Sequence, residues 1–159
     1  MASCSRLIWP GQWRGGGRLQ RGLARVCGND QFARMARPKS ALIVDDEPHV
    51  RTYVKLILAQ LGITDCHQAG NLEQAREEYD ACQPELVMLD INLQGNSGLE
   101  LLREIRAIDP ETCIIMLSAA ALSTTVREAL DAGADGFLRK DLPRAKIVEQ
   151  LEEIFAEEP

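Results

Sequence analysis

The sequence lacks the features that would place the protein in a membrane or around a structural zinc ion. No apolar run approaches the ~18–20 residues that a membrane span requires, and the longer ones, such as 113–117, have the length of buried strands. The five cysteines are odd in number and none forms a CxxC pair, so neither a disulfide framework nor a zinc site is indicated. We expect reduced thiols in a cytoplasmic protein that does not contact a membrane.

Acidic residues are scarce in the first quarter of the chain. Residues 1–40 contain eight Lys or Arg and a single acid, Asp30, which gives this segment a net charge of +7. Because the whole chain has a formal charge of −6, the remaining 119 residues carry −13. A domain this acidic is a poor candidate for direct nucleic-acid binding, since affinity for the phosphate backbone depends on Lys and Arg.

The basic segment also has no apolar periodicity, and five of the twelve glycines lie between positions 11 and 22. Such a composition cannot bury a core. We therefore expect residues 1–38 to be a disordered, basic Gly/Arg-rich extension and residues 39–159 to form one folded domain. Three explanations of the extension stay open: translation that starts at Met35, a flexible basic tail, or an organelle-targeting segment.

From Ser40 onward, short apolar runs alternate with stripes of helical spacing. The expected strands are 41–44, 65–69, 86–89, 112–117 and 136–138. Boundary signals accompany the helices between them: Pro48 and Gly62, an Asn71 cap and Pro84, a capping box at 97–100, and Gly133. In the fourth helix the expected apolar stripe is Leu122, Val126, Ala129 and Leu130.

Five strand–helix alternations predict an α/β domain with a parallel sheet covered by helices on both faces. Their number and length favour a five-stranded, doubly wound, flavodoxin-like sheet with the strand order 2-1-3-4-5.

Polar residues follow four of the five predicted strands. They are Asp45 and Asp46 after the first, Asp90 after the third, Ser118 after the fourth and Lys140 after the fifth. Any one of these alone would be read as a turn, a cap or a solvated surface residue. Because a parallel sheet brings the carboxyl ends of its strands to one edge, where ligands of such folds bind, their agreement predicts a site.

Three neighbouring carboxylates repel one another unless a hard divalent cation lies between them. Carboxylate oxygens, together with water and phosphate oxygens, are ligands that Mg²⁺ prefers. A carboxylate can also act as a nucleophile toward a phosphoryl group. Lys140 would then hold Asp90 and later a phosphoryl oxygen, and the Ser118 hydroxyl would contact another of these oxygens.

The motifs Asp45-Asp46-Glu47-Pro48, 88–92 with Gly98, 117–119 and 137–140 resemble the receiver domains of response regulators, over residues 41–155. The resemblance implies that Asp90 is the phosphoacceptor, that Asp45, Asp46, Asp90 and the backbone carbonyl of Asn92 hold Mg²⁺, and that Ser118 and Lys140 take the hydroxyl and lysine roles. It makes Phe137 the aromatic residue that turns inward on activation. It also implies phosphorelay signalling between a histidine kinase or histidine phosphotransfer protein and an unknown downstream partner, with homodimerisation on phosphorylation as one outcome.

Residues 126–142 are most similar to receivers that are joined to a helix-turn-helix DNA-binding domain. No such output domain follows in this sequence. In many receivers a proline, often preceded by a cis peptide, directly follows the lysine. Here Asp141 takes that place, so we do not expect a cis bond.

Three other protein classes have features in common with this sequence. A phosphatase of the haloacid dehalogenase class uses similar residues, but its nucleophile lies on the first strand, the reverse of the order here. A degenerate receiver would act as a phosphate-independent binding module. A phosphohistidine carrier would need His49 or His67, and neither lies on a predicted helix bundle. We expect a protein that catalyses only its own phosphorylation and dephosphorylation.

Overall fold

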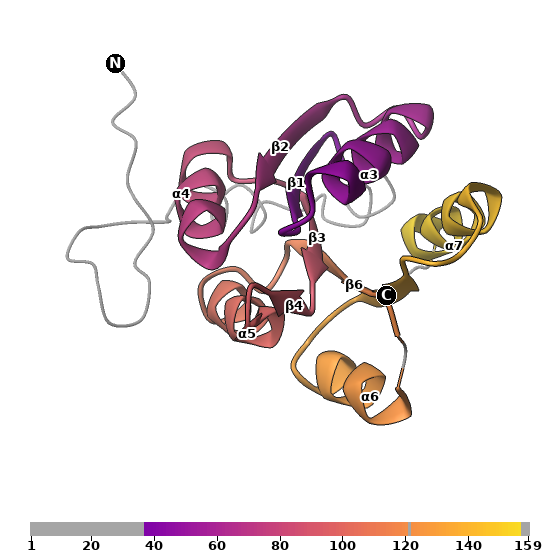
Figure 1. Cartoon of the computed structure of the whole chain (residues 1–159). Helices are drawn as coiled ribbons and strands as arrows, with labels where there is room; N and C mark the ends of the chain where they lie inside the picture. Colours follow the sequence, from indigo (N-terminus) through magenta and orange to yellow (C-terminus); the bar gives the residue numbers. More distant parts are fainter. Residues whose placement is uncertain (1–36, 121, 157–159) are drawn as a thin grey trace, which may run out of the picture.

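The five predicted strands form one parallel sheet in the order β2-β1-β3-β6-β7, so the predicted order 2-1-3-4-5 is confirmed. Figure 1 shows the computed structural model, which describes residues 37–120 and 122–156. The strands are β1 (Ser40–Val44), β2 (Asp65–Ala69), β3 (Leu86–Asp90), β6 (Cys113–Ser118) and β7 (Gly136–Arg139). Residues 1–36, which include the proposed start at Met35, lie outside the described residues.

Helices cover both faces of the sheet (Figure 1). They are α3 (Pro48–Gln60), α4 (Leu72–Cys82), α5 (Gly98–Ile108), α6 (Ser123–Asp131) and α7 (Arg144–Ala156). One apolar core lies between the sheet and α3 and α7, and a second lies between the sheet and α4, α5 and α6. In β1, Ala41 and Ile43 enter the first core, while Leu42 and Val44 enter the second. Residues 41–44 of this strand are all apolar and buried, as expected of a strand with both faces covered.

Local signals set most of the helix boundaries. The side chain of Asn71 accepts a hydrogen bond of 2.9 Å from the Gln74 amide, as expected of a helix cap. Pro48 opens α3, and Gly62 follows this helix with a φ of 86°, a conformation that glycine adopts without strain. Among the described residues no peptide bond is cis, as expected.

Two expectations about helices were wrong in part. Ser97 does cap α5, but its hydroxyl accepts from the Leu99 amide rather than from Glu100, whose carboxylate lies 3.5 Å from Arg76 instead of completing a capping box. In α6, Ala129 is the residue that enters the core, whereas Leu122 and Leu130 are 66% and 49% exposed. Leu122 precedes the helix as its N-cap residue, and Leu130 lies on the part of α6 that the core does not cover.

The structure also contains a small hairpin that the sequence did not predict. β4 (Asn92–Leu93) pairs antiparallel with β5 (Asn96–Ser97) just after β3. Its turn consists of Gln94 and Gly95, both with positive φ. Two-residue strands are too short to show periodicity in a sequence. None of the helices within 37–120 and 122–156 is long and apolar enough to span a bilayer.

Candidate functional site

Backbone hydrogen bonds continue one residue beyond the ends of β1, β3 and β7. They hold the backbone at the polar residues of these strand ends in place. The amide of Asp45 donates to the Ala69 carbonyl at 3.1 Å, and the amide of Lys140 donates to the Ser118 carbonyl at 2.8 Å. After Asp90, the amide of Ile91 donates to Leu117 at 3.0 Å. These bonds tie each polar residue to a neighbouring strand, so the side chains leave the sheet at one edge.

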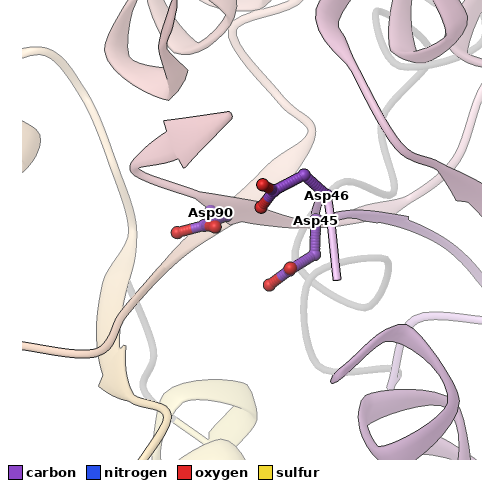
Figure 2. Close-up of side chains that lie close together, drawn as sticks. All are labelled: Asp45, Asp46 and Asp90. Atoms are coloured by element: carbon purple, nitrogen blue, oxygen red, sulfur yellow. The ribbon is translucent and has the colours of Figure 1, made fainter. Parts of the chain in front are cut away.

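Three carboxylates gather at this edge. Figure 2 shows Asp45 and Asp46, which follow β1, beside Asp90 at the end of β3. One carboxylate oxygen from each lies within 4.8 Å of the others. Asp45 is fully buried and Asp90 is 5% exposed, while Asp46 is half-buried. The sequence-predicted acids therefore come together, with two of them withdrawn from solvent.

Lys140 lies against two of these acids. Its Nζ donates a hydrogen bond of 2.9 Å to Oδ2 of Asp90 and lies 2.5 Å from Oδ2 of Asp45. Burial of Lys140 acts to lower its pKa, but the two carboxylates outweigh this effect and the pKa is raised. The lysine is therefore held in its charged form.

The pKa of Asp90 is raised. Burial is the largest cause, the charge of Asp45 adds to it, and the hydrogen bond from Lys140 acts in the opposite direction. The amide of Asn92 also donates to Oδ1 of Asp90 at 3.2 Å and favours the carboxylate. Asp90 is thus oriented by two donors on its two oxygens.

The donor set suits a hard divalent cation. All three candidate ligands are carboxylates, which is the chemistry that Mg²⁺ favours. Oδ2 of Asp45 is buried and lies 2.5 Å from the Lys140 ammonium. A buried carboxylate that already faces one cation, next to two further acids, fits a cation ligand.

Ser118 belongs to the same edge but its hydroxyl is engaged elsewhere. It donates to the Ala120 carbonyl at 2.7 Å and lies 3.2 Å from the Ala120 amide, which donates to it. Phe137 lies on β7, is half-buried and packs against the core beneath α4, α5 and α6. Asn92 starts the unpredicted hairpin and is exposed. Neither Ser118 nor Phe137 contacts the acids in this conformation through any hydrogen bond found among the described residues.

Gly98 determines how closely α5 approaches the phosphoacceptor candidate. A Cβ on Gly98 would lie 2.0 Å from the backbone oxygen of Asp90, and the Gly98 amide donates to Ile91 at 2.6 Å. Gly98 belongs to the receiver-like motif, but the sequence alone indicates no role for it. The sequence shows only that a glycine opens the helix eight residues after Asp90.

A cavity of about 360 Å³ opens beside the acids, between α3 and α7. Its walls are mostly apolar, and Glu47, Lys140 and Asp141 lie at its charged border. None of the three clustered aspartates lines it. The chemistry therefore resides in the acidic cluster, and the cavity is a neighbouring feature.

Residues 41–152 match the protein family described as the response regulator receiver domain. The chain belongs to this family. Its receiver domain is 34% identical over 116 residues to the chemotaxis protein CheY of Thermotoga maritima, covering 73% of this chain and 97% of CheY. It is also 34% identical over 122 residues to the nitrate/nitrite response regulator NarL of Escherichia coli K12, covering 76% of this chain and 56% of NarL.

Solved structures agree with this family. The crystal structure of the receiver domain of NtrX from Brucella abortus has a TM-score of 0.68 and 31% identity, covering 75% of this chain and all of the other. The chain thus spans nearly all of CheY but only about half of NarL. The similarity to receivers joined to a helix-turn-helix domain finds only loose support. CheY, which this chain spans almost completely, and the longer NarL are both 34% identical to it. As a receiver domain, the protein belongs to two-component systems, in which such domains interact with histidine kinases and downstream targets.

Proposed function

We propose that this receiver domain acts in the cytoplasm as a response regulator that accepts a phosphoryl group on Asp90 in a Mg²⁺-dependent reaction. The donor would be a histidine kinase or a histidine phosphotransfer protein. The observation that carries the proposal is the buried Asp90 carboxylate, hydrogen-bonded to Lys140 and within a few ångströms of Asp45 and Asp46.

Asp90 is the nucleophile in this proposal. A carboxylate oxygen attacks the phosphorus of phosphohistidine, the new O–P bond forms, the P–N bond breaks, and its electron pair returns to the imidazole. Lys140 holds the attacking carboxylate in place and then neutralises charge on the transferred group. Hydrolysis of the acyl phosphate by water restores Asp90, so the domain acts only on its own phosphoryl group.

Asp45, Asp46, Asp90 and the backbone carbonyl of Asn92 would hold Mg²⁺. When bound, the ion would neutralise charge on the phosphoryl oxygens, which is its usual contribution to phosphoryl transfer. The carboxylate donor set, with one oxygen of each acid within 4.8 Å of the others, supports this assignment.

Phosphorylation would change the surface formed by α6, β7 and α7. A phosphoryl group adds about −1.5 to −2 charges and would draw the Ser118 hydroxyl away from Ala120. Phe137 would then turn inward into the space that Ser118 leaves. Leu122 and Leu130, which are exposed on and beside α6, give this surface an apolar component for a downstream partner or a second copy. The partner-facing charges would be Arg127, Glu128, Arg144, Lys146 and Glu149.

Intact mass measured after incubation with phosphoramidate tests the proposal. The wild type should gain one phosphoryl group in the presence of Mg²⁺, and not when the metal is chelated. Asp90→Asn should gain none under either condition. A folded wild type that binds Mg²⁺ but takes up no phosphoryl group would instead favour a phosphate-independent binding module.

A further inference from the structure

Arg51 lies behind the acidic cluster and was not among the residues that the sequence singled out. It belongs to the first turns of α3, where its amide donates to the Glu47 carbonyl at 3.2 Å. Its side chain turns back toward the sheet, and Nη1 donates a hydrogen bond of 2.5 Å to the backbone oxygen of Asp45. That oxygen belongs to the peptide unit that joins Asp45 to Asp46.

This contact completes the anchoring of Asp45. The Asp45 amide is already bonded to Ala69 on β2, and Oδ1 accepts from the Glu47 amide at 2.9 Å. The guanidinium of Arg51 supplies a bond to the carbonyl, so the backbone of Asp45 is held on both sides. The orientation of one peptide unit therefore sets the directions in which the first two candidate metal ligands leave the chain.

The turn between β2 and α4 supports the guanidinium from behind. A Cβ on Gly70 would lie 3.3 Å from Nη1 of Arg51 and 3.5 Å from Oε1 of Gln74. Gln74 is itself fixed, because Oε1 accepts from the Gly70 amide at 2.9 Å and its own amide is capped by Asn71. The guanidinium thus fills the space that the absence of a side chain at position 70 leaves.

We infer that Arg51 is a positioning residue for the divalent cation, acting through the peptide unit between Asp45 and Asp46. This inference rests on the proposed Mg²⁺ site. Groups that hold metal ligands in place from outside the coordination sphere commonly change metal affinity when they are removed. Mg²⁺ is sensitive to such changes because it demands near-ideal octahedral geometry.

The charge of Arg51 affects a bound cation in the opposite direction. The sign of the change in Mg²⁺ affinity therefore distinguishes the two effects. A guanidinium near the site repels Mg²⁺, so loss of its charge alone would tighten binding. Loss of its hydrogen bond would loosen binding, because the peptide unit could then rotate. Arg51 is only half-buried, so solvent screens its charge, and we expect the positioning effect to be the larger one.

Calorimetric titration of Mg²⁺ into the full chain separates the two effects. Arg51→Ala should bind Mg²⁺ about 10-fold more weakly than the wild type. Arg51→Lys keeps a donor and should fall between the two. The matched control is Lys55→Ala, which removes the same charge from an exposed position one turn further along α3 and should bind as tightly as the wild type or slightly more tightly.

Other outcomes would overturn the inference. If Arg51→Ala binds Mg²⁺ as tightly as the wild type, or more tightly, Arg51 acts through charge or not at all. If the wild type itself binds no Mg²⁺, the proposed metal site and the role of Arg51 both fail. Should Arg51→Ala not fold, Gly70→Ala decides instead: its methyl group presses on the guanidinium without removing it, and unchanged Mg²⁺ affinity in that variant would contradict the positioning role.

Discussion

Nζ of Lys140 donates a hydrogen bond of 2.9 Å to Oδ2 of Asp90, a residue 50 positions earlier in the chain. The same ammonium lies 2.5 Å from Asp45. A single cation that directly follows β7 therefore contacts acids at the carboxyl ends of the neighbouring strands β1 and β3. The contact links the stability of the site to its proposed chemistry, because removing the lysine leaves two buried carboxylates facing each other.

Lys140→Ala should destabilise the fold when Mg²⁺ is absent. The side chains of Asp45 and Asp90 are 0% and 7% exposed, so they would lose their main counter-charge in a buried setting. We expect a loss of about 3 kcal/mol in the free energy of unfolding, measured by urea denaturation with a chelator. Added Mg²⁺ should restore part of it. Lys146→Ala is the matched control, because Lys146 pairs with Glu149 on the exposed face of α7 and its loss should leave stability nearly unchanged.

Asp90→Asn should stabilise the metal-free fold at neutral pH. Burial and the Asp45 charge raise the pKa of Asp90, so the folded state favours the protonated form more than the unfolded state does. Ionisation of Asp90 therefore lowers the stability of the native state as pH rises from the ordinary pKa of an aspartate through the raised pKa of Asp90. The advantage of Asp90→Asn should be present at pH 7 and should shrink as pH falls below the ordinary pKa. Equal stability of the two proteins at every pH would contradict the raised pKa, and Glu77→Gln on the exposed face of α4 controls for loss of one acid.

Gly98→Ala should disturb Asp90 through its backbone. The new Cβ would lie 2.0 Å from the Asp90 carbonyl oxygen, so β3 and α5 must move apart. We expect a loss of about 2–3 kcal/mol in unfolding free energy, typical of overpacking, together with slower uptake of phosphoryl groups from phosphoramidate. Gly95→Asn in the nearby hairpin turn is the control: nothing lies within 4 Å of a Cβ there, and Asn tolerates its positive φ. Similar behaviour of the two variants would refute the close-approach argument.

Tyr79→Phe should weaken the fold without changing the proposed chemistry. The Tyr79 hydroxyl lies 3.0 Å from Oδ2 of Asp109, to which it donates, and 2.9 Å from Thr112, all buried. Removing it should cost about 1–3 kcal/mol in unfolding free energy, because buried acceptors lose a donor. Phosphoryl uptake by the folded variant should be unchanged. Tyr53→Phe is the control, since the half-buried Tyr53 has no hydroxyl hydrogen bond among the described residues.

The sheet was predictable because burial on both faces leaves a direct mark on the sequence. The runs at 41–44 and 86–89 are apolar at every position, and the structure places them in adjacent central strands. The strand 65–69 is more polar, which is typical of a sheet edge, and it pairs with β1 alone. Convergence of Asp45, Asp46, Asp90 and Lys140 then follows from parallel topology.

Contacts that depend on side-chain direction were not predictable. The sequence places Ser118 at a strand end, but its hydrogen bonds to Ala120 depend on the turn that follows. Arg51 resembles any exposed arginine on an amphipathic helix until the fold brings its guanidinium to the Asp45 carbonyl. Leu122 and Leu130 are exposed because the core covers only part of α6. The extent of that cover depends on the tertiary fold and cannot be read from the local sequence.

Location of the phosphoryl group on the chain tests the central claim most directly. Borohydride reduces an aspartyl phosphate to homoserine, and tandem mass spectrometry of the tryptic peptide 77–103 distinguishes Asp90 from Asp80, the other aspartate in that peptide. After treatment with phosphoramidate and Mg²⁺, we predict homoserine at position 90 and an unmodified Asp80. Homoserine at any other position, or none in a folded protein that binds Mg²⁺, would contradict the assignment of Asp90 as the phosphoacceptor.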